Sequence, residues 1–257
     1  MTPIPASLRD IARDLKISIQ FCTRLPLGPT LDVRGAEIAR TAWALPVAGA
    51  LVGLIGALAY SVSHAVGVPP WPAAALALAA TAIATGCLHE DGLADTADGF
   101  GGGGTRERKL EIMRDSRIGT YGTCALMLSI LIKAGAIASL ATPAQVTASL
   151  IAAHAAGRAS MPILMWLVPA ARTDGLSADA AGVSSGSAMM AAAIGLAVAA
   201  LAMSGMDALL IGLCLLLAIG GMARLSIKQI GGQTGDVLGA IEQVGEIIVL
   251  LVAAVRH

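Results

Sequence analysis

The sequence predicts an all-α fold, a polytopic helical bundle of about seven membrane spans preceded by an N-terminal interfacial helix. Hydrophobic residues make up 56% of the 257 residues and charged residues only 13%, a balance unusual for soluble domains. The charges are also segregated, so that long stretches carry none. A backbone inside a bilayer has no water to bond and satisfies its polar groups within helices. We therefore expect one membrane-embedded domain over residues 1–257.

The first element is expected over residues 1–24. Arg9, Arg13 and Lys16 stand there among apolar residues, as is typical of a helix lying in a membrane interface. The stretch lacks the compact apolar core of a cleavable signal, so no such signal is expected. The four cysteines of the chain are scattered without a metal-binding spacing, and we interpret them as packing residues without a disulfide.

Seven apolar runs then approach the roughly 20 residues that a bilayer requires. They are rich in small residues, which favour close helix packing within a membrane. The runs are Trp43–Val66, Trp71–Leu88, Gly122–Ala141, Gln145–Pro169, Ser187–Met203, Asp207–Ala223 and Val237–Val255.

The basic residues between these runs predict the orientation. Six Lys or Arg precede the first run, five follow the second, one follows the fourth and two follow the sixth, whereas the intervening loops have none. Only Arg256, at the end of the chain, breaks this alternation. By the positive-inside rule, the N-terminus and the polar loops 89–121, 170–186 and 224–236 should be cytoplasmic.

The stretch from His89 to Gly122 holds seven of the 17 carboxylates. Within it, Asp91, Asp95 and Asp98 are spaced so that a helix would present all three on one face. Carboxylates placed together in an apolar setting repel one another and need a cation. Oxygen ligands suit Mg²⁺ or Mn²⁺ better than Zn²⁺. The alternative is a solvated acidic helix end at the membrane surface.

The same stretch continues with features that suit phosphate. The run Gly101–Gly104 matches no nucleotide-binding fingerprint and is either a flexible connector or a hinge for the amphipathic segment that follows it. Arg114, Ser116, Arg117 and Gly119 come next. Arginines beside backbone N–H groups that glycine leaves accessible favour phosphate oxygens. The alternative is that they anchor the third span at the membrane surface.

A second polar motif precedes the last apolar run. Thr234, Gly235 and Asp236 predict a capped helix start whose amides are open to an anion. Glu246 lies farther along the same helix, inside the apolar run, and an intramembrane carboxylate suggests a functional site. Lys133 and Arg158 are the only Lys and Arg within the expected spans, so pairing with either is the alternative, and the two roles are compatible.

Together these motifs closely resemble the cobalamin synthase family, also called adenosylcobinamide-GDP ribazoletransferases. The resemblance covers the whole chain in order and spacing. It rests on three motifs: His89-x-Asp91-Gly-Leu-Ala-Asp95-Thr-x-Asp98-Gly, Asp115-Ser-Arg117-x-Gly119, and Gly231-Gly232-x-Thr234-Gly235-Asp236-x-Leu238-Gly239-Ala240 with Glu246 downstream.

The resemblance implies a Mg²⁺-dependent enzyme of the bacterial cytoplasmic (inner) membrane that acts in the last steps of coenzyme B12 synthesis. It would join adenosylcobinamide-GDP to α-ribazole, or to its 5′-phosphate, and release GMP. Its partners would be these substrates and the lipid bilayer, without nucleic acid. The sequence leaves the oligomeric state open, a homo-oligomer included.

Residue roles follow from matching this chemistry to the motifs. Asp91, Asp95 and Asp98 are expected to bind Mg²⁺, while Glu90 ranks below them because the family pattern does not require an acid there. The expected catalytic acids and bases are His89, Asp98 and Asp236. The expected substrate-binding residues are Arg114, Ser116, Arg117, Gly119, Thr234, Gly235 and Glu246.

Two other classes of protein compete with this interpretation. A CDP-alcohol phosphotransferase also uses clustered aspartates and Mg²⁺, but its Asp-Gly would be followed by Ala-Arg, whereas Asp95 follows Ala94 here. A cation-coupled transporter would account for Glu246, Lys133 and Arg158 within the membrane. Transporters generally show internal repeats and polar groups near the bilayer midplane, whereas this chain gathers its polar residues toward one face.

Overall fold

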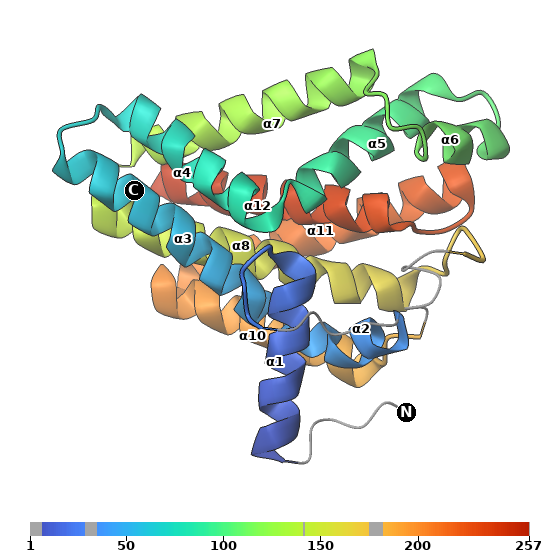
Figure 1. Ribbon diagram of the computed structural model, residues 1–257, viewed down its shortest axis with the longest axis horizontal. Coiled ribbons are helices and arrows are strands. Elements are labelled where there is room, and N and C mark those ends of the chain that lie inside the picture. The colour runs from blue at the N-terminus through green and yellow to red at the C-terminus, as the bar shows by residue number, and fades with distance from the viewer. Residues whose placement is uncertain (1–6, 29–34, 141, 175–181, 257) are drawn as a thin grey trace.

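The computed structural model describes residues 7–28, 35–140, 142–174 and 182–256. These residues form helices and contain no strand, apart from an isolated parallel bridge between Ala170 and Gln233. Six helices are long and apolar enough to cross a membrane, and a bent helix pair adds a seventh crossing if it counts as one span. The long helices run side by side along the molecule (Figure 1), which confirms the predicted all-α membrane bundle.

Helix α1 (Leu8–Cys22) is the expected amphipathic N-terminal helix, and it runs across the long helices (Figure 1). It is tied to the bundle by Asp14, whose side chain is completely buried. One Asp14 oxygen lies 2.5 Å from Arg40 Nη1 in α2 (Gly35–Thr41), and the other accepts a 3.0 Å hydrogen bond from Trp43 Nε1 in the 3₁₀ turn η1 (Ala42–Ala44). An ion pair therefore fixes α1 on the bundle where sequence periodicity alone predicts only an apolar face.

The centre of the bundle is the crossing of α3 (Leu45–Ala65) and α8 (Pro143–Leu167). A side chain at Gly49 would meet the backbone of His154, and one at Gly53 would meet the backbone of Leu150. The two helices can approach this closely because glycine leaves the backbone uncovered, the packing mode favoured in membranes. The predicted spans over these helices are confirmed to within a few residues.

The second predicted span, Trp71–Leu88, was wrong at its end. Helix α4 (Pro70–Thr85) stops after 16 residues, and the chain bends by 92° into α5 (Leu88–Gly102). Gly86 and Cys87 both adopt left-handed backbone angles, with φ of 66° and 58°, and so end the first helix. At about 1.5 Å per residue, α4 covers roughly 24 Å, which is less than the hydrocarbon core of about 30 Å.

Most of the segment 89–121, the expected connection between two spans, is helical and packed, and the aspartates lie on a helix as their spacing predicts. Helix α5 packs against α7 (Thr120–Ser139) and against α12 (Gly235–Arg256), and α6 (Arg106–Ile112) folds back beside it. Gly92 in α5 and Gly239 in α12 lie at the contact, where a side chain on either would meet the other helix's backbone. The aspartate helix is therefore a fixed wall of the bundle.

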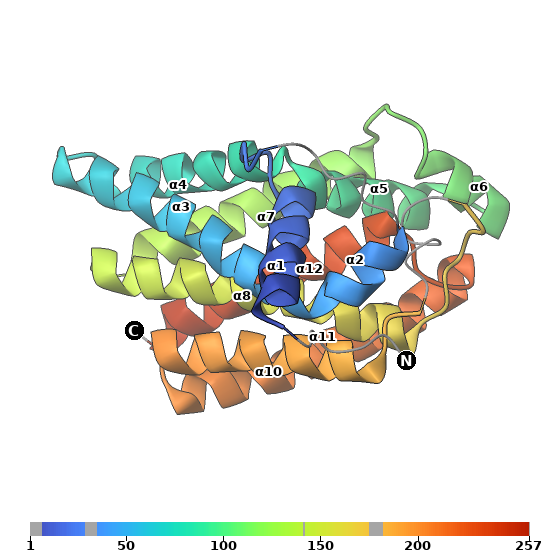
Figure 2. The same cartoon turned by 60° about the horizontal axis from the view of Figure 1, so that its bottom comes forward.

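Helices α10 (Ser185–Ala202) and α11 (Gly205–Ile230) lie on one side of the bundle, with α4 and α5 on the other (Figure 2). Helix α11 takes up the first half of the expected loop 224–236 and ends at Gly231, whose φ of 77° caps it. At the far end, Arg256 Nε donates a 3.0 Å hydrogen bond to Asp207. The one basic residue that broke the charge alternation therefore has a structural partner.

The close crossing of α3 and α8 gives a direct test of this packing. Replacing Gly53 by alanine should lower the free energy of unfolding by roughly 1–3 kcal/mol, because the new methyl group forces two backbones apart. Gly220 in α11 has open space around it, so Gly220→Ala is the matched control and should be neutral or slightly stabilising. Thermal unfolding in detergent measures both variants, and equal melting temperatures would contradict the proposed contact.

Candidate functional site

A network of buried polar side chains joins four helices in the middle of the bundle. We call it the charge network, and its members are His89 of α5, Lys133 of α7, His154 and Arg158 of α8, and Glu242, Gln243 and Glu246 of α12. Each member has 4% or less of its surface exposed, which is rare for charged residues unless they are paired.

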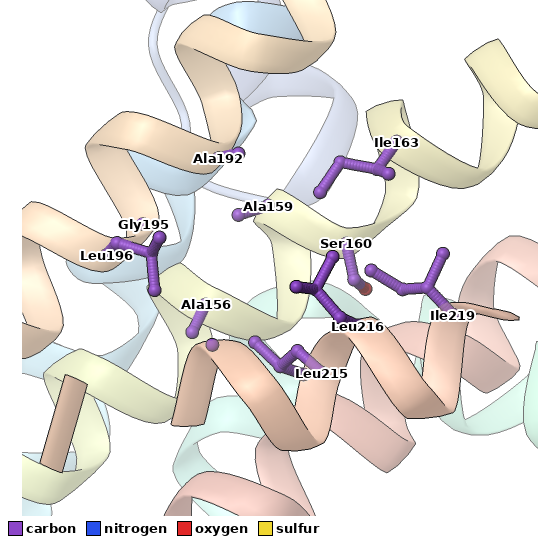
Figure 3. A pocket seen from close by; sticks show the side chains of 11 residues that line it. Ala156, Ala159, Ser160, Ile163, Ala192, Gly195, Leu196, Leu215, Leu216 and Ile219 are labelled. Carbon is purple, nitrogen blue, oxygen red and sulfur yellow. The ribbon is translucent and has the colours of Figure 1, made fainter. Parts of the chain in front are cut away.

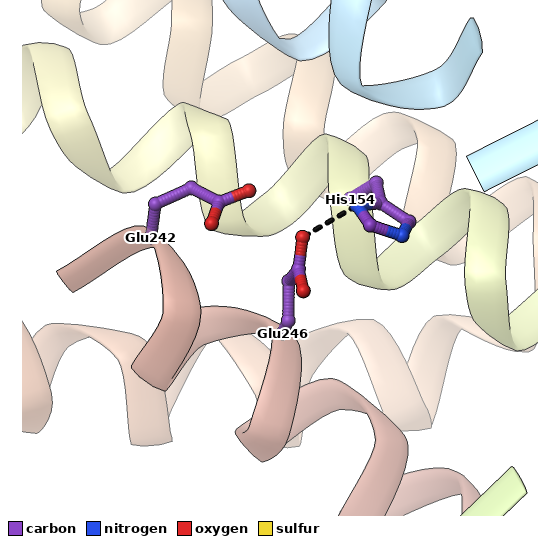
Figure 4. Close-up of side chains that lie close together, drawn as sticks. All are labelled: His154, Glu242 and Glu246. Carbon is purple, nitrogen blue, oxygen red and sulfur yellow. Dashed lines mark ion pairs between the residues drawn. The ribbon is translucent and has the colours of Figure 1, made fainter. Parts of the chain in front are cut away.

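The pairing within the charge network is dense. Lys133 Nζ donates to Gln243 Oε1 at 2.7 Å and to Glu246 Oε2 at 3.0 Å. Arg158 Nη1 forms an ion pair with Glu242 Oε1 at 2.6 Å. Figure 4 shows Glu246 facing His154 across the gap between α12 and α8, with an ion pair drawn between them. The expected pairing of Glu246 with Lys133 and Arg158 is therefore present.

Sequence analysis missed Glu242 as a member of this network. Its position four residues before Glu246 places both carboxylates on one face of α12, and that spacing was the available signal. Within the described ranges, His154, Glu242 and Glu246 are the one trio of potential ligands whose donor atoms lie close enough for a metal ion. Lys133 and Arg158 already balance the two carboxylates, so the site does not fit a divalent cation.

The three aspartates of α5 have different surroundings. Asp98 is buried, and its two oxygens accept hydrogen bonds from the backbone N–H groups of Gly119 at 2.7 Å and Gly122 at 2.9 Å. It therefore caps the N-terminus of α7, where a negative charge is favourable. Its expected role as a metal ligand stays a prediction, but both of its oxygens already have partners.

Asp91 and Asp95 instead face the start of α12. The carboxylates of Asp91, Asp98 and Asp236 all lie near enough to Asp95 to disfavour its negative charge, and Asp91 acts on Asp236 in the same way. Arg172 is a cation that favours the charged form of both Asp95 and Asp236. The fold therefore brings Asp236, which is far away in sequence, to two of the three predicted metal ligands.

Two cavities have Asp91 in their linings. The larger, of about 530 Å³, is lined on its polar side by Glu90, Asp91, Asp95, Arg114, Asp115 and Ser116. The smaller, of about 160 Å³, is lined by His89, Asp91 and Asp236 together with apolar side chains of α1, α8 and α12. A molecule in each cavity would reach the same carboxylate, which is the arrangement that a two-substrate reaction requires.

The predicted phosphate-binding residues are not all turned toward the larger cavity. Arg114 and Ser116 line it, although the Arg114 guanidinium is held by both oxygens of Asp174 at 2.6 and 2.7 Å. Arg117 is 87% exposed and forms a bidentate pair with Asp115. Hydrogen bonds from Arg117 lower the pKa of the Asp115 carboxyl to about 2, so this pair remains charged at neutral pH.

The motif before α12 has the predicted capping geometry. Thr234 Oγ1 accepts a 3.4 Å hydrogen bond from the backbone N–H of Val237 and donates a 3.1 Å bond to Asp236 Oδ2. Gly235 lines the smaller cavity. Sequence analysis missed Arg172, which donates to the carbonyl of Leu110 at 2.8 Å, and no spacing signal in its own loop could have indicated it.

A third cavity, of about 110 Å³, lies between α8, α10 and α11 and is shown in Figure 3. Its lining is apolar apart from Ser160, whose hydroxyl donates to the carbonyl of Gly157. The lining has no titratable side chain, so this cavity offers packing space and no chemistry.

Known proteins resemble the chain over nearly its whole length. The sequence model of the family described as cobalamin-5-phosphate synthase matches residues 14–254. An adenosylcobinamide-GDP ribazoletransferase of Bradyrhizobium diazoefficiens is 57% identical over 99% of this chain and 98% of its own length. Proteins of the same name from Mesorhizobium japonicum and Azorhizobium caulinodans are 54% and 44% identical, over 97% and 94% of this chain and 95% of each relative. No solved structure matches.

The geometry of Asp98 separates a structural role from a metal-binding one. Asp98→Asn replaces one acceptor oxygen by an amide donor that faces a backbone N–H, so it should lower the free energy of unfolding by about 1–3 kcal/mol. Asp91→Asn is the matched control, and it should leave stability unchanged. Thermal unfolding in a chelator-containing buffer removes any metal contribution, and equal stability of both variants would contradict the capping role.

Proposed function

The chain belongs to the cobalamin-5-phosphate synthase family, and we propose that it is an adenosylcobinamide-GDP ribazoletransferase. The observation that supports this most directly is that Asp91 lines two cavities, one large with arginine and carboxylates and one small and largely apolar. The reaction needs two such sites, because a large corrinoid nucleotide and a small nucleoside must approach the same phosphorus.

The proposed reaction is a displacement at phosphorus. A ribose ring hydroxyl of α-ribazole, or of its 5′-phosphate, attacks the phosphorus that carries the corrinoid side chain, and the bond from this phosphorus to the bridging oxygen of GMP breaks. The 5′ oxygen is not the nucleophile, because it already carries a phosphate in the second acceptor. The attacking hydroxyl loses its proton, and GMP leaves with the bridging electron pair. Positioning and charge stabilisation provide most of the catalysis in such transfers.

We propose that Asp91 and Asp95 hold Mg²⁺. Asp98, the third ligand predicted from the sequence, has both of its oxygens occupied by the amides of Gly119 and Gly122, so it supports the site by holding α7. The carboxylates fit this ion because they are oxygen donors gathered at one wall of the larger cavity, where Asp95 is repelled by three neighbouring acids. When bound, the ion would neutralise charge on the phosphate oxygens. Arg114 and Ser116, which line the same cavity, would then bind the pyrophosphate.

Asp236 is the general base that the geometry favours among the three predicted candidates. Its carboxylate lines the smaller cavity, and the hydroxyl of Thr234 holds one of its oxygens in place. Asp98 is occupied by the amides of α7, and His89 is held within the charge network. Asp236 can therefore take the hydroxyl proton from a nucleoside in the smaller cavity.

The competing classes fit less well. A transporter needs polar side chains that can release one another to bind the transported ion. Lys133 and Arg158 instead form ion pairs with Glu246 and Glu242 inside the charge network. The family match covers residues 14–254 and leaves no part of the chain for a CDP-alcohol phosphotransferase domain.

We also propose that the enzyme lies in the bacterial cytoplasmic membrane with its two cavities at the cytoplasmic side, where nucleotides are available. Reporter fusions at Thr105 and after Lys228 should then signal cytoplasm, and fusions at Pro69 and Pro143 should signal the opposite side. The short loops at Pro69 and Pro143 join α3 to α4 and α7 to α8. A cytoplasmic signal at Pro69 would contradict the proposed topology.

The proposed activity is tested by GMP release from adenosylcobinamide-GDP and α-ribazole with the purified protein. Asp91→Asn and Asp95→Asn should each reduce turnover at least about tenfold, the effect of roughly 1.4 kcal/mol of lost transition-state stabilisation. The loss should be greatest at low Mg²⁺ if these residues bind the ion. Asp10→Asn, in the first turn of α1 and outside the linings of both cavities, is the matched control.

Absence of GMP release by the wild-type protein with either form of the acceptor would contradict the proposed activity. Full activity of both Asp91→Asn and Asp95→Asn would leave the activity standing and contradict the metal assignment.

A further inference from the structure

We propose that the 160 Å³ cavity binds the aromatic base of the acceptor nucleoside, and that His89 donates its Nε2–H to a ring nitrogen of that base. This inference rests on the proposed function, because it takes α-ribazole to be the acceptor. The 160 Å³ cavity would then be the binding site of the base, and the hydrogen bond from His89 would determine which bases are accepted.

The cavity has an apolar body and a polar end. Its apolar lining includes Phe21 and Leu45 as well as Met161, Met165 and Leu238. A cavity of roughly 150 Å³ with an apolar lining holds a benzene ring, so this cavity suits the buried part of a fused aromatic base. The methionines add favourable sulfur contacts to an aromatic ring.

The tautomer of His89 follows from its neighbours. Arg158 Nη2 lies 3.3 Å from His89 Nδ1, and a guanidinium can only donate, so Nδ1 must be the acceptor. The nearest carboxylate oxygen, of Glu242, is 3.8 Å from the same nitrogen, too far to take a hydrogen bond from it. The ring proton therefore resides on Nε2.

His89 Nε2 is buried and lacks a hydrogen-bond partner among the residues that the structure describes. A buried donor without a partner is costly, and native proteins generally satisfy it. Because His89 lines the cavity, an acceptor atom on a bound molecule would remove that cost. Arg158 acts here as a positioning residue, and its own ion pair with Glu242 at 2.6 Å holds it in place.

The base of α-ribazole has the matching chemistry. It is a dimethylated benzimidazole, with an apolar edge for the methionines and leucines and one unsubstituted ring nitrogen that accepts a hydrogen bond. With the base held there, the ribose points to the polar end formed by Asp91 and Asp236. Asp91 also lines the larger cavity, so a ribose ring hydroxyl would lie beside the pyrophosphate of the donor.

A binding cycle on the full-length protein in detergent tests this assignment. Two nucleosides are compared, α-ribazole and an analogue in which a C–H replaces the acceptor ring nitrogen. The wild-type protein should bind α-ribazole about fivefold more tightly, the effect of one net hydrogen bond. His89→Phe should remove this preference, and His89→Gln, which keeps a donor, should retain part of it. His64→Phe is the matched control, because His64 is exposed beside Tyr60, and it should keep the full preference.

A second variant covers the case in which His89→Phe fails to fold. Met165→Trp fills the cavity and should weaken both nucleosides about tenfold or more, without raising the KM for adenosylcobinamide-GDP. Met189→Trp, on an exposed face of α10, is its control. An unchanged preference in folded His89→Phe, or wild-type affinity in Met165→Trp, would overturn the assignment.

The outcomes of this test are separable from those of the activity assay. GMP release together with an unchanged nucleoside preference would reject the cavity assignment and leave the proposed function standing. A preference that depends on His89, without GMP release, would support the nucleoside site and reject the reaction.

Discussion

The structure depends on the buried ion pairing of Lys133 and Arg158 with Glu242 and Glu246. Each of these groups would be expensive to bury alone, and together they balance in charge. Along α8 and α12 the pairs lie between two apolar clusters, one that includes Leu150 and Val249 and one that includes Met161 and Ile241. A displacement of α7, α8 or α12 relative to the others would leave a charge without its partner, so the network specifies how the helices are aligned.

This alignment extends to the candidate site through His89. The histidine is the first-turn residue of α5 that reaches Arg158, and Asp91 follows two positions later. The bend at Gly86 and Cys87 is what turns α5 into this position, since a straight continuation of α4 would carry the aspartates away from α12. The charge network therefore sets the position of Asp91 and Asp95 in α5, and Asp91 lines both cavities.

The aspartates of this region differ in their surroundings and therefore in the roles that are open to them. Asp98 is used to hold α7, Asp91 and Asp95 are free of hydrogen bonds to backbone amides in the described structure and face the larger cavity, and Asp236 faces the smaller one. Residues of the same type, within one helix, therefore serve stability at one position and the proposed chemistry at others. The distinction depends on which backbone amides approach each carboxylate.

The sequence by itself determined the helical membrane class, most span positions and the three polar motifs. These depend on local properties, namely apolar run length, charge segregation and residue spacing along one helix. Composition could not reveal the 92° bend after α4, because it arises from two left-handed residues, one of which is Cys87. Nor could it show that Asp98 caps α7, that Arg117 turns away to Asp115, or that Arg172 approaches Asp236. The contacts of Asp98 and Arg172 join segments distant in sequence, so only the tertiary packing decided them. Arg117 instead pairs with Asp115 two residues away, a local contact that residue spacing alone does not select over a ligand in the cavity.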